Sequence, residues 1–276
     1  MNTTPNNPSP ARVVLFGGSS VRTSYLPIAA QHHVVLGGLL REAYPGQAVT
    51  VENRADNGEF IARYLLRGTY ERHRADLPGI DVAIIRFGTN DQKRMDVDEY
   101  RRQFEKFLAL LEQDFPGLHL ILETGIYVDY PEHYNFDRNL ELDPYWQVSR
   151  DLAQERNLPL VDYYAACKRE AERGNWDIRV RRGLVIDSAQ DAGKEGSADW
   201  FTDIHPNPRG TRLAAAEEAR VLRAAFPRLL PVGQTTATRE PENTAFYERY
   251  LDFPSDRLVV PSKPTPCDAL QESVGT

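Results

Sequence analysis

The sequence predicts an α/β fold built on a mainly parallel sheet, because short apolar runs alternate with helix-like stretches along most of the chain. The runs are rich in β-branched residues and apolar on both faces, which is typical of strands buried between layers of helices. The expected strands are 13–16, 49–53, 82–87, 118–122 and 158–161. Strands that are joined in this way by helices form βαβ units.

The helices between these strands are expected from the spacing of their apolar residues. From 98 to 115 apolar side chains recur at steps of three and four, and charged residues cover the other side. These apolar residues are Tyr100, Phe104, Leu108, Leu111 and Phe115. A last, Ala-rich helix is expected at 210–230, with Pro227 and Pro231 at its end. We therefore expect the folded domain to close near residue 230.

Three segments follow from this pattern: a flexible N-terminal lead-in at 1–11, one folded domain at 12–230 and a Pro-rich C-terminal tail at 231–276. The lead-in and the tail lack the periodic apolar residues of a packed domain. Within the tail, residues 245–251 are apolar enough to form a short docking helix. The pattern leaves the role of the tail and the oligomeric state open.

The charge balance argues against nucleic acid as a partner. The 276 residues include 33 Lys and Arg against 40 Asp and Glu, which gives a net charge of −7, and an acidic surface is repelled by polyanions and by anionic lipid.

No apolar run approaches the ~20 residues of a membrane span, and the first residues do not resemble a signal peptide. We expect a cytoplasmic protein. Cys167 and Cys267 are too few for a disulfide framework or a zinc site.

Residues of types that can take part in catalysis follow the expected strands. In a doubly wound sheet, ligands bind beyond the carboxyl ends of the strands. Ser19 follows the first strand, Gly58 follows the second and Asn90 follows the third. His205 precedes the last helix, which can fold back onto the same edge of the sheet. We expect these four residues to converge.

This set contains the parts that acyl transfer needs: a nucleophile, a base within reach of it, and donors aimed at the oxyanion. Ser19 at a strand-to-helix turn is the expected nucleophile, and its backbone N–H and that of Gly58 are the expected oxyanion donors. The side-chain amide of Asn90 adds a third donor. His205 is the expected general base, because an imidazole that titrates near neutrality can accept and return a proton.

These residues resemble the blocks of the SGNH (GDSL-type) hydrolases over residues 12–226. Gly17-Gly18-Ser19 is similar to the Gly-Asp-Ser block of that family, Gly88-Thr89-Asn90-Asp91 to its Gly-x-Asn-Asp block, and Asp203-Ile204-His205-Pro206 to its last block. The resemblance implies a three-layer α/β/α sandwich with a mainly parallel, flavodoxin-like sheet. It also implies hydrolysis of esters of lipids, small alcohols or acylated sugars without a metal.

Two departures from the family pattern concern the first block. Gly18 stands where the family usually has Asp, which removes a hydrogen-bonding side chain but no catalytic group. Ser20 follows Ser19 directly, so a shift of one residue would make Ser20 the nucleophile. We favour Ser19 because the strand is expected to end at Phe16 and the family serine lies two residues after the first glycine of the turn.

A third departure concerns the residue that orients His205. The family usually places an Asp three residues before the His, and Thr202 occupies that position. Some sugar-acetyl esterases of the wider family have the sequence Asp-Ile-His-Pro in this block, so we expect Asp203 to complete the triad. Asp199 or a backbone carbonyl are the alternatives.

A long polar and aromatic stretch at 125–144 is the expected substrate-binding loop. It follows the fourth strand at the active-site edge, and its length of about 20 residues exceeds the usual connection. Tyr127, Tyr134 and Arg138 are the expected binding residues, because aromatic faces with polar donors between them suit a sugar ring. A lid that packs on itself is the alternative.

We therefore expect a serine esterase that removes acetyl or other short acyl groups from a carbohydrate or small alcohol through an acyl-enzyme intermediate. A non-catalytic glycan-binding module on the same fold and an O-acyltransferase are the alternatives. We expect no cofactor, and no metal because His and carboxylate residues do not cluster in the sequence. The expected partner is a small-molecule or carbohydrate ester, with no nucleic acid and no membrane span.

Overall fold

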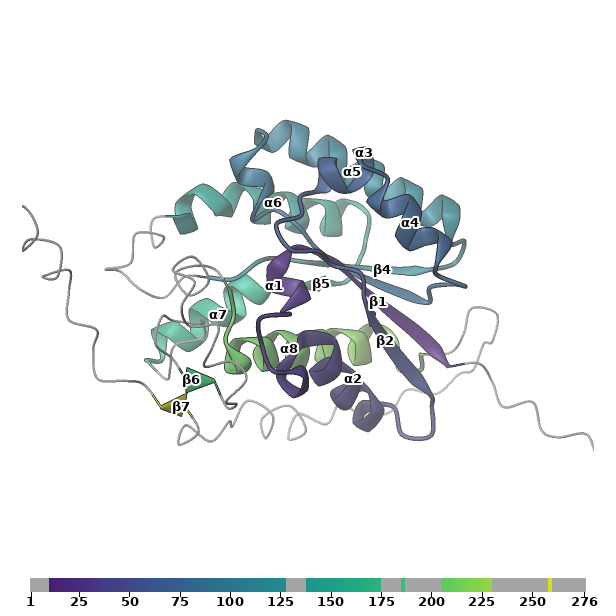
Figure 1. Cartoon of the computed structure of the whole chain (residues 1–276), viewed down its shortest axis with the longest axis vertical. Helices are drawn as coiled ribbons and strands as arrows, with labels where there is room; N and C mark the ends of the chain where they lie inside the picture. Colours follow the sequence, from purple (N-terminus) through teal and green to yellow (C-terminus); the bar gives the residue numbers. More distant parts are fainter. Residues whose placement is uncertain (1–9, 128–137, 175–184, 187–204, 230–257, 260–276) are drawn as a thin grey trace, which may run out of the picture.

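The computed structural model of the chain describes residues 10–127, 138–174, 185–186, 205–229 and 258–259 (Figure 1). Within these residues a parallel sheet of five strands forms the middle layer, and helices cover both of its faces. The fold is a three-layer α/β/α sandwich, as expected from the sequence.

The sheet has the strand order β2-β1-β3-β4-β5, which is the order of flavodoxin-like doubly wound sheets. Its strands are β1 (Ala11–Gly17), β2 (Val49–Asn53), β3 (Val82–Arg86), β4 (His119–Glu123) and β5 (Leu160–Val161). All four pairings are parallel, and Leu15 of β1 lies beside Asn53 of β2 and Ile84 of β3. The order reverses between β1 and β3, so the carboxyl ends of these two strands border the crevice where such folds bind ligands.

Two sets of helices cover the sheet on opposite faces (Figure 1). One face carries α2 (His32–Ala43), α7 (Tyr163–Glu172) and α8 (Pro208–Ala225). The other carries α3 (Ile61–Leu66), α4 (Thr69–Ala75), α5 (Val97–Asp114) and α6 (Arg138–Glu155). Side chains of β1 divide between the two cores: Val13 and Leu15 join the first, and Val14 and Phe16 join the second. Burial on both faces explains why the inner strands β1, β3 and β4 are mostly apolar runs.

Shorter elements complete the described residues. They are α1 (Ser19–Arg22), η1 (Ile28–Ala30), η2 (Asp91–Lys93), β6 (Val185–Ile186) and β7 (Leu258–Val259). The last two strands pair antiparallel to each other. In the part of the chain that the structure describes, no helix has both the length and the apolar character that a membrane span needs.

The strands and helices agree with the sequence pattern except at two places. The last helix covers 208–225 and not 210–230, because Asn207 caps its start and the chain turns away before Pro227. The expected loop at 125–144 is shorter, because α6 begins at Arg138 and runs through Pro144. The helix of the tail expected at 245–251 lies outside the described residues.

Candidate active site

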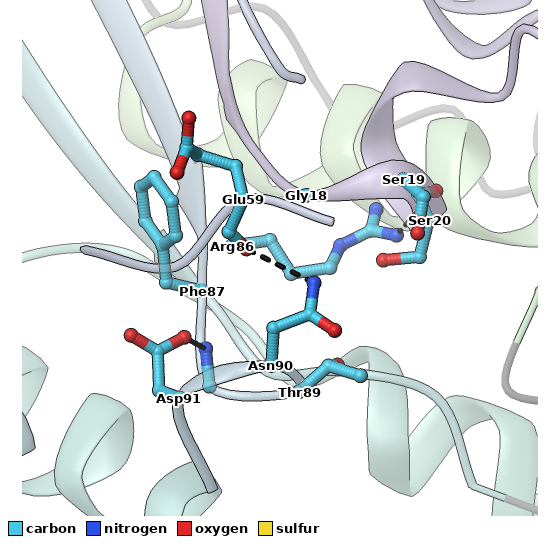
Figure 2. Close-up of a pocket in the computed structure, with 10 residues that line it drawn as sticks. Gly18, Ser19, Ser20, Glu59, Arg86, Phe87, Thr89, Asn90 and Asp91 are labelled. Carbon is cyan, nitrogen blue, oxygen red and sulfur yellow. Dashed lines mark hydrogen bonds between the residues drawn. The ribbon is translucent and has the colours of Figure 1, made fainter. Parts of the chain in front are cut away.

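A pocket lies at the crevice between β1 and β3 (Figure 2). It contains about 240 Å³ of space, part of it open to solvent. Its lining comes from the turn after β1, the loop after β2 and the loop after β3: Gly18, Ser19, Ser20, Glu59, Arg86, Phe87, Gly88, Thr89, Asn90 and Asp91. Two of the residues that the sequence singled out, Ser19 and Asn90, are therefore at one site.

The turn that carries Ser19 is formed by two glycines. A Cβ atom at Gly17 would lie 2.4 Å from the backbone oxygen of Arg86, so this position excludes every side chain. Gly18 precedes α1, and its carbonyl accepts the N–H groups of Val21 and Arg22 at 3.0 Å each. Ser19 is thus the first residue of a single helical turn.

Gly18 lies close to the amide of Asn90. A Cβ atom at this position would be 3.2 Å from Asn90 Nδ2 and 3.3 Å from the carbonyl oxygen of Glu59. Contacts of this length are tighter than most side chains tolerate, so the Asp that the family usually has here would press on Asn90. The departure from the family pattern leaves room for the present position of the Asn90 side chain.

His205, which is distant from Ser19 in the sequence, lies beside it in the fold. Its Nε2 atom is 2.8 Å from Ser19 Oγ, although 186 residues separate the two. His205 lies just before α8, where the side chain of Asn207 accepts the N–H of Gly210 at 2.9 Å and caps the helix. Ser20 is buried instead, with 8% of its surface exposed. The geometry therefore favours Ser19 over Ser20 as the partner of His205.

The amide of Asn90 points across the pocket (Figure 2). Its Nδ2 donates to the carbonyl of Glu59 at 3.0 Å. A primary amide has two N–H groups, so one donor is left for a ligand in the pocket.

Gly58 has φ of 68°, a left-handed conformation that glycine adopts readily. The next residue, Glu59, is the one that borders the pocket.

Asp91 links the loop after β3 to the start of α3, a role that the sequence pattern does not predict. Its carboxylate is fully buried and accepts the N–H of Ile61 at 2.8 Å and the N–H of Gly88 at 2.8 Å. Burial raises the pKa of Asp91 to about 6. The Gly-x-Asn-Asp block pointed to this residue, but its partner at position 61 is not visible in a local motif.

A buried charge network lies beneath the Ser19 turn. Arg86 Nε donates to Glu123 Oε2 at 2.8 Å, and Arg86 Nη2 is 3.5 Å from Glu218 Oε1. Glu218 Oε2 is 2.8 Å from Nε2 of His32. The guanidinium also donates to the carbonyl of Ser20 at 3.3 Å. This network joins β3, β4, α2 and α8 directly to the turn of the candidate nucleophile.

Burial determines the protonation of this network. It raises the pKa of Glu123 to about 8 and that of Glu218 to about 7, because a charged carboxylate is poorly solvated there, and Arg86 only partly offsets this effect. Burial and the nearby guanidinium lower the pKa of His32 to about 3. His32 is therefore neutral at physiological pH.

Several of the expected site residues lie outside the described part of the chain: Asp199, Thr202, Asp203 and Tyr134, and also the side chain of Arg138. Tyr127 is described, and its ring packs edge-on against Tyr164 with 5.5 Å between the ring centroids. Among the described residues, no three or more His, Cys, Asp or Glu side chains gather into a group that could hold a metal ion.

The sequence also matches the model of the GDSL-like lipase/acylhydrolase family over residues 29–213. The chain belongs to this family. The matched range includes Gly58, Asn90 and His205 and begins after Ser19. As a member of the GDSL-like lipase/acylhydrolase family, the protein is an ester hydrolase of the SGNH type. No curated protein sequence matches the chain.

Solved structures of several proteins share the fold. An acetylxylan esterase from Geobacillus stearothermophilus is 19% identical with a TM-score of 0.56, and the match covers 82% of this chain and 98% of that one. A lipolytic G-D-S-L protein from Veillonella parvula is 18% identical with a TM-score of 0.55, covering 79% and 99%. An α/β hydrolase from a Lake Arreo metagenome is 16% identical with a TM-score of 0.53, covering 76% and 94%. At such identities the likeness shows the fold alone.

Proposed function

We propose that this GDSL-type hydrolase removes acetyl or other short acyl groups from a carbohydrate or small alcohol, with Ser19 as the nucleophile. The observation that carries the proposal is the 2.8 Å contact between Ser19 Oγ and His205 Nε2 beside a pocket that Asn90 also lines. A serine hydroxyl becomes a strong nucleophile when a base at this distance takes its proton.

The reaction follows from these positions. Nε2 of His205 takes the proton of Ser19 while Oγ bonds to the ester carbonyl carbon, and the carbonyl oxygen becomes an oxyanion. The free N–H of the Asn90 amide and the backbone N–H groups of Ser19 and Gly58 donate to this oxygen. The imidazolium of His205 then protonates the leaving alcohol, which gives an acyl-enzyme. Water attacks the acyl-enzyme by the same route, and Ser19 recovers its proton.

Asp203 is the proposed residue that orients His205. In a triad, a carboxylate that accepts the second ring N–H fixes the tautomer and stabilises the imidazolium. Asp203 lies two residues before His205 in the sequence, close enough to take this role, and Asp199 or a backbone carbonyl are the alternatives.

The short acyl group of the proposal is supported by the similarity in fold to an acetylxylan esterase. The carbohydrate part of the proposal has two supports: the similarity in fold to an acetylxylan esterase, and the aromatic and polar residues Tyr127, Tyr134 and Arg138 that follow β4 in the sequence.

Turnover of p-nitrophenyl esters of increasing chain length tests the acyl preference, with acetyl-xylose and other acetyl sugars as natural-type substrates. We expect kcat/KM to fall from acetate to octanoate. Ser19→Ala should abolish turnover, with a loss of ~10⁶ in kcat, while Ser20→Ala keeps more than about a tenth of it. Equal loss in both variants, or loss only in Ser20→Ala, would show that Ser19 is not the nucleophile.

A fluorophosphonate probe separates an enzyme from a glycan-binding module on the same fold, because it labels only an activated serine. We expect the wild-type protein to be labelled and Ser19→Ala not to be. Turnover that depends on an added sugar acceptor, in place of water, would identify an O-acyltransferase.

A further inference from the structure

Tyr25, which follows Ser19 closely in the sequence, contacts the segment that contains His205. This tyrosine lies in the connection between α1 and η1, six residues after Ser19. Its hydroxyl donates to the carbonyl oxygen of Pro206 at 2.9 Å. Its ring meets the His205 ring edge-on, with 5.2 Å between the centroids and 79° between the planes.

These two contacts restrict different degrees of freedom. The hydrogen bond fixes the backbone directly after His205, and it is buried, so water does not compete for the carbonyl. The edge-on ring contact has the geometry that aromatic pairs prefer, and it limits rotation of the imidazole plane. Tyr25 is only 5% exposed. Together the contacts hold both the position and the plane of the imidazole.

Tyr25 is itself tied to the Ser19 turn. The N–H of Thr23 donates to the carbonyl of Ser19 at 2.9 Å, and the N–H of Leu26 donates to the carbonyl of Thr23 at 3.0 Å. The hydroxyl of Thr23 accepts the N–H of His32 at 2.8 Å, which anchors the segment on α2. One short segment therefore carries the nucleophile at one end and holds the base at the other.

We propose that Tyr25 is a positioning residue that keeps Nε2 of His205 directed at Ser19 Oγ. The proposal rests on the proposed function, in which these two atoms exchange a proton. Tyr25 does not touch the substrate in this scheme and acts only through His205. Burial raises the pKa of the phenol well above its usual value, so the hydroxyl remains a donor throughout the working range of an esterase.

The test compares two substitutions that make the same chemical change. Tyr25→Phe removes the hydroxyl and keeps the ring. Tyr44→Phe is the matched control, because the buried Tyr44 donates to the carbonyl of Phe226 at 2.8 Å, at the opposite end of α8. Both hydroxyls join the N-terminal part of the chain to the ends of one helix.

We expect Tyr25→Phe to lower kcat for p-nitrophenyl acetate by ~10-fold with KM unchanged, since small displacements of a catalytic group cost up to about 10² in rate. Tyr44→Phe should keep kcat within about twofold, since it leaves the groups at the Ser19 end of α8 in place. Tyr25→Leu, which removes the ring as well, should lower kcat further than Tyr25→Phe does. The melting temperature of each variant is measured first, so that all rates are taken at a temperature at which the variant is folded.

A second comparison separates positioning from general support of the fold. In a His205→Ala background, adding Tyr25→Phe should leave the residual rate unchanged, because a residue that acts through His205 has no effect once the imidazole is gone. An equal loss in both backgrounds overturns the positioning role. Equal kcat in Tyr25→Phe and Tyr44→Phe also overturns it.

The fluorophosphonate reaction of the wild-type protein keeps the two proposals distinguishable. A wild-type Ser19 that does not react overturns the proposed function and the role of Tyr25 with it. A reactive wild-type Ser19 together with unchanged reactivity in Tyr25→Phe overturns the positioning role alone.

Discussion

Replacing Glu123 by Gln should change how the stability of the protein depends on pH. Glu123 Oε2 accepts from Arg86 Nε at 2.8 Å, and the amide oxygen of Gln can accept the same hydrogen bond. Gln is neutral at every pH, so it imitates the protonated acid. Near pH 6, where Glu123 with its pKa of about 8 is protonated in the folded state, we expect the variant and the wild type to have similar free energies of unfolding.

The sign of the effect follows from the raised pKa. Between pH 6 and 8 the carboxyl of Glu123 is ionised in the unfolded chain and protonated in the folded one, so the folded state binds more protons. The stability of the wild type therefore falls as pH rises, by about 1.4 kcal/mol per pH unit from this group. Over two units the loss amounts to about 2–3 kcal/mol. The Gln variant lacks this loss.

Urea denaturation of both proteins at pH 6 and at pH 8.5 measures the difference. We expect Glu123→Gln to gain about 2–3 kcal/mol on the wild type between the two conditions. Because each protein is compared with itself at two pH values, any constant effect of the substitution on packing cancels. A change below about 1 kcal/mol, or a change in the opposite direction, would show that the buried carboxyl is ionised across this range.

Asn90→Ala should lower kcat by ~10²–10³ with KM little changed, because in the proposed mechanism the amide donates to the oxyanion and not to the ground-state carbonyl. Steady-state kinetics measure this, with Asn57→Ala, an exposed amide in the loop after β2, as the control, and a raised KM with constant kcat would contradict it. Asp203→Asn should lower kcat by up to ~10⁴ without unfolding the protein, while Thr202→Ala stays mild. Measuring these variants beside Asp199→Asn decides which group orients the imidazole, and a loss under about tenfold in Asp203→Asn would remove that residue from the triad.

The sequence pattern predicted the sheet well, because both faces of the inner strands β1, β3 and β4 are buried and local composition carries that information. The short glycine turn after β1 was equally visible, and with it the place of Ser19. The start of α6 was not predicted, because the aromatic and polar residues of 125–144 were assigned to one loop, whereas the helix begins at Arg138 and runs through Pro144.

The supporting residues of the site could not be predicted from local patterns. Arg86 was read as part of an apolar strand, and its partners Glu123 and Glu218 come from β4 and α8. Asp91 accepts N–H groups from its own loop and from Ile61, 30 residues away. Every residue except proline has a backbone N–H, so the sequence does not indicate which N–H groups a carboxylate will accept. Such hydrogen bonds can be identified only in the folded structure.

The separation of 186 residues between Ser19 and His205 has a consequence for the newly made chain. At the usual speed of synthesis, ~10–40 s pass between the emergence of the serine and that of the histidine. During this interval the hydroxyl has no base beside it. The apolar face of α2, with Leu36 and Leu40, is uncovered for the same period, because α8 supplies Leu213 and its neighbours to that core. Docking of one late helix thus both completes the core and brings His205 beside Ser19, so the proposed nucleophile and base meet only after most of the chain has been made.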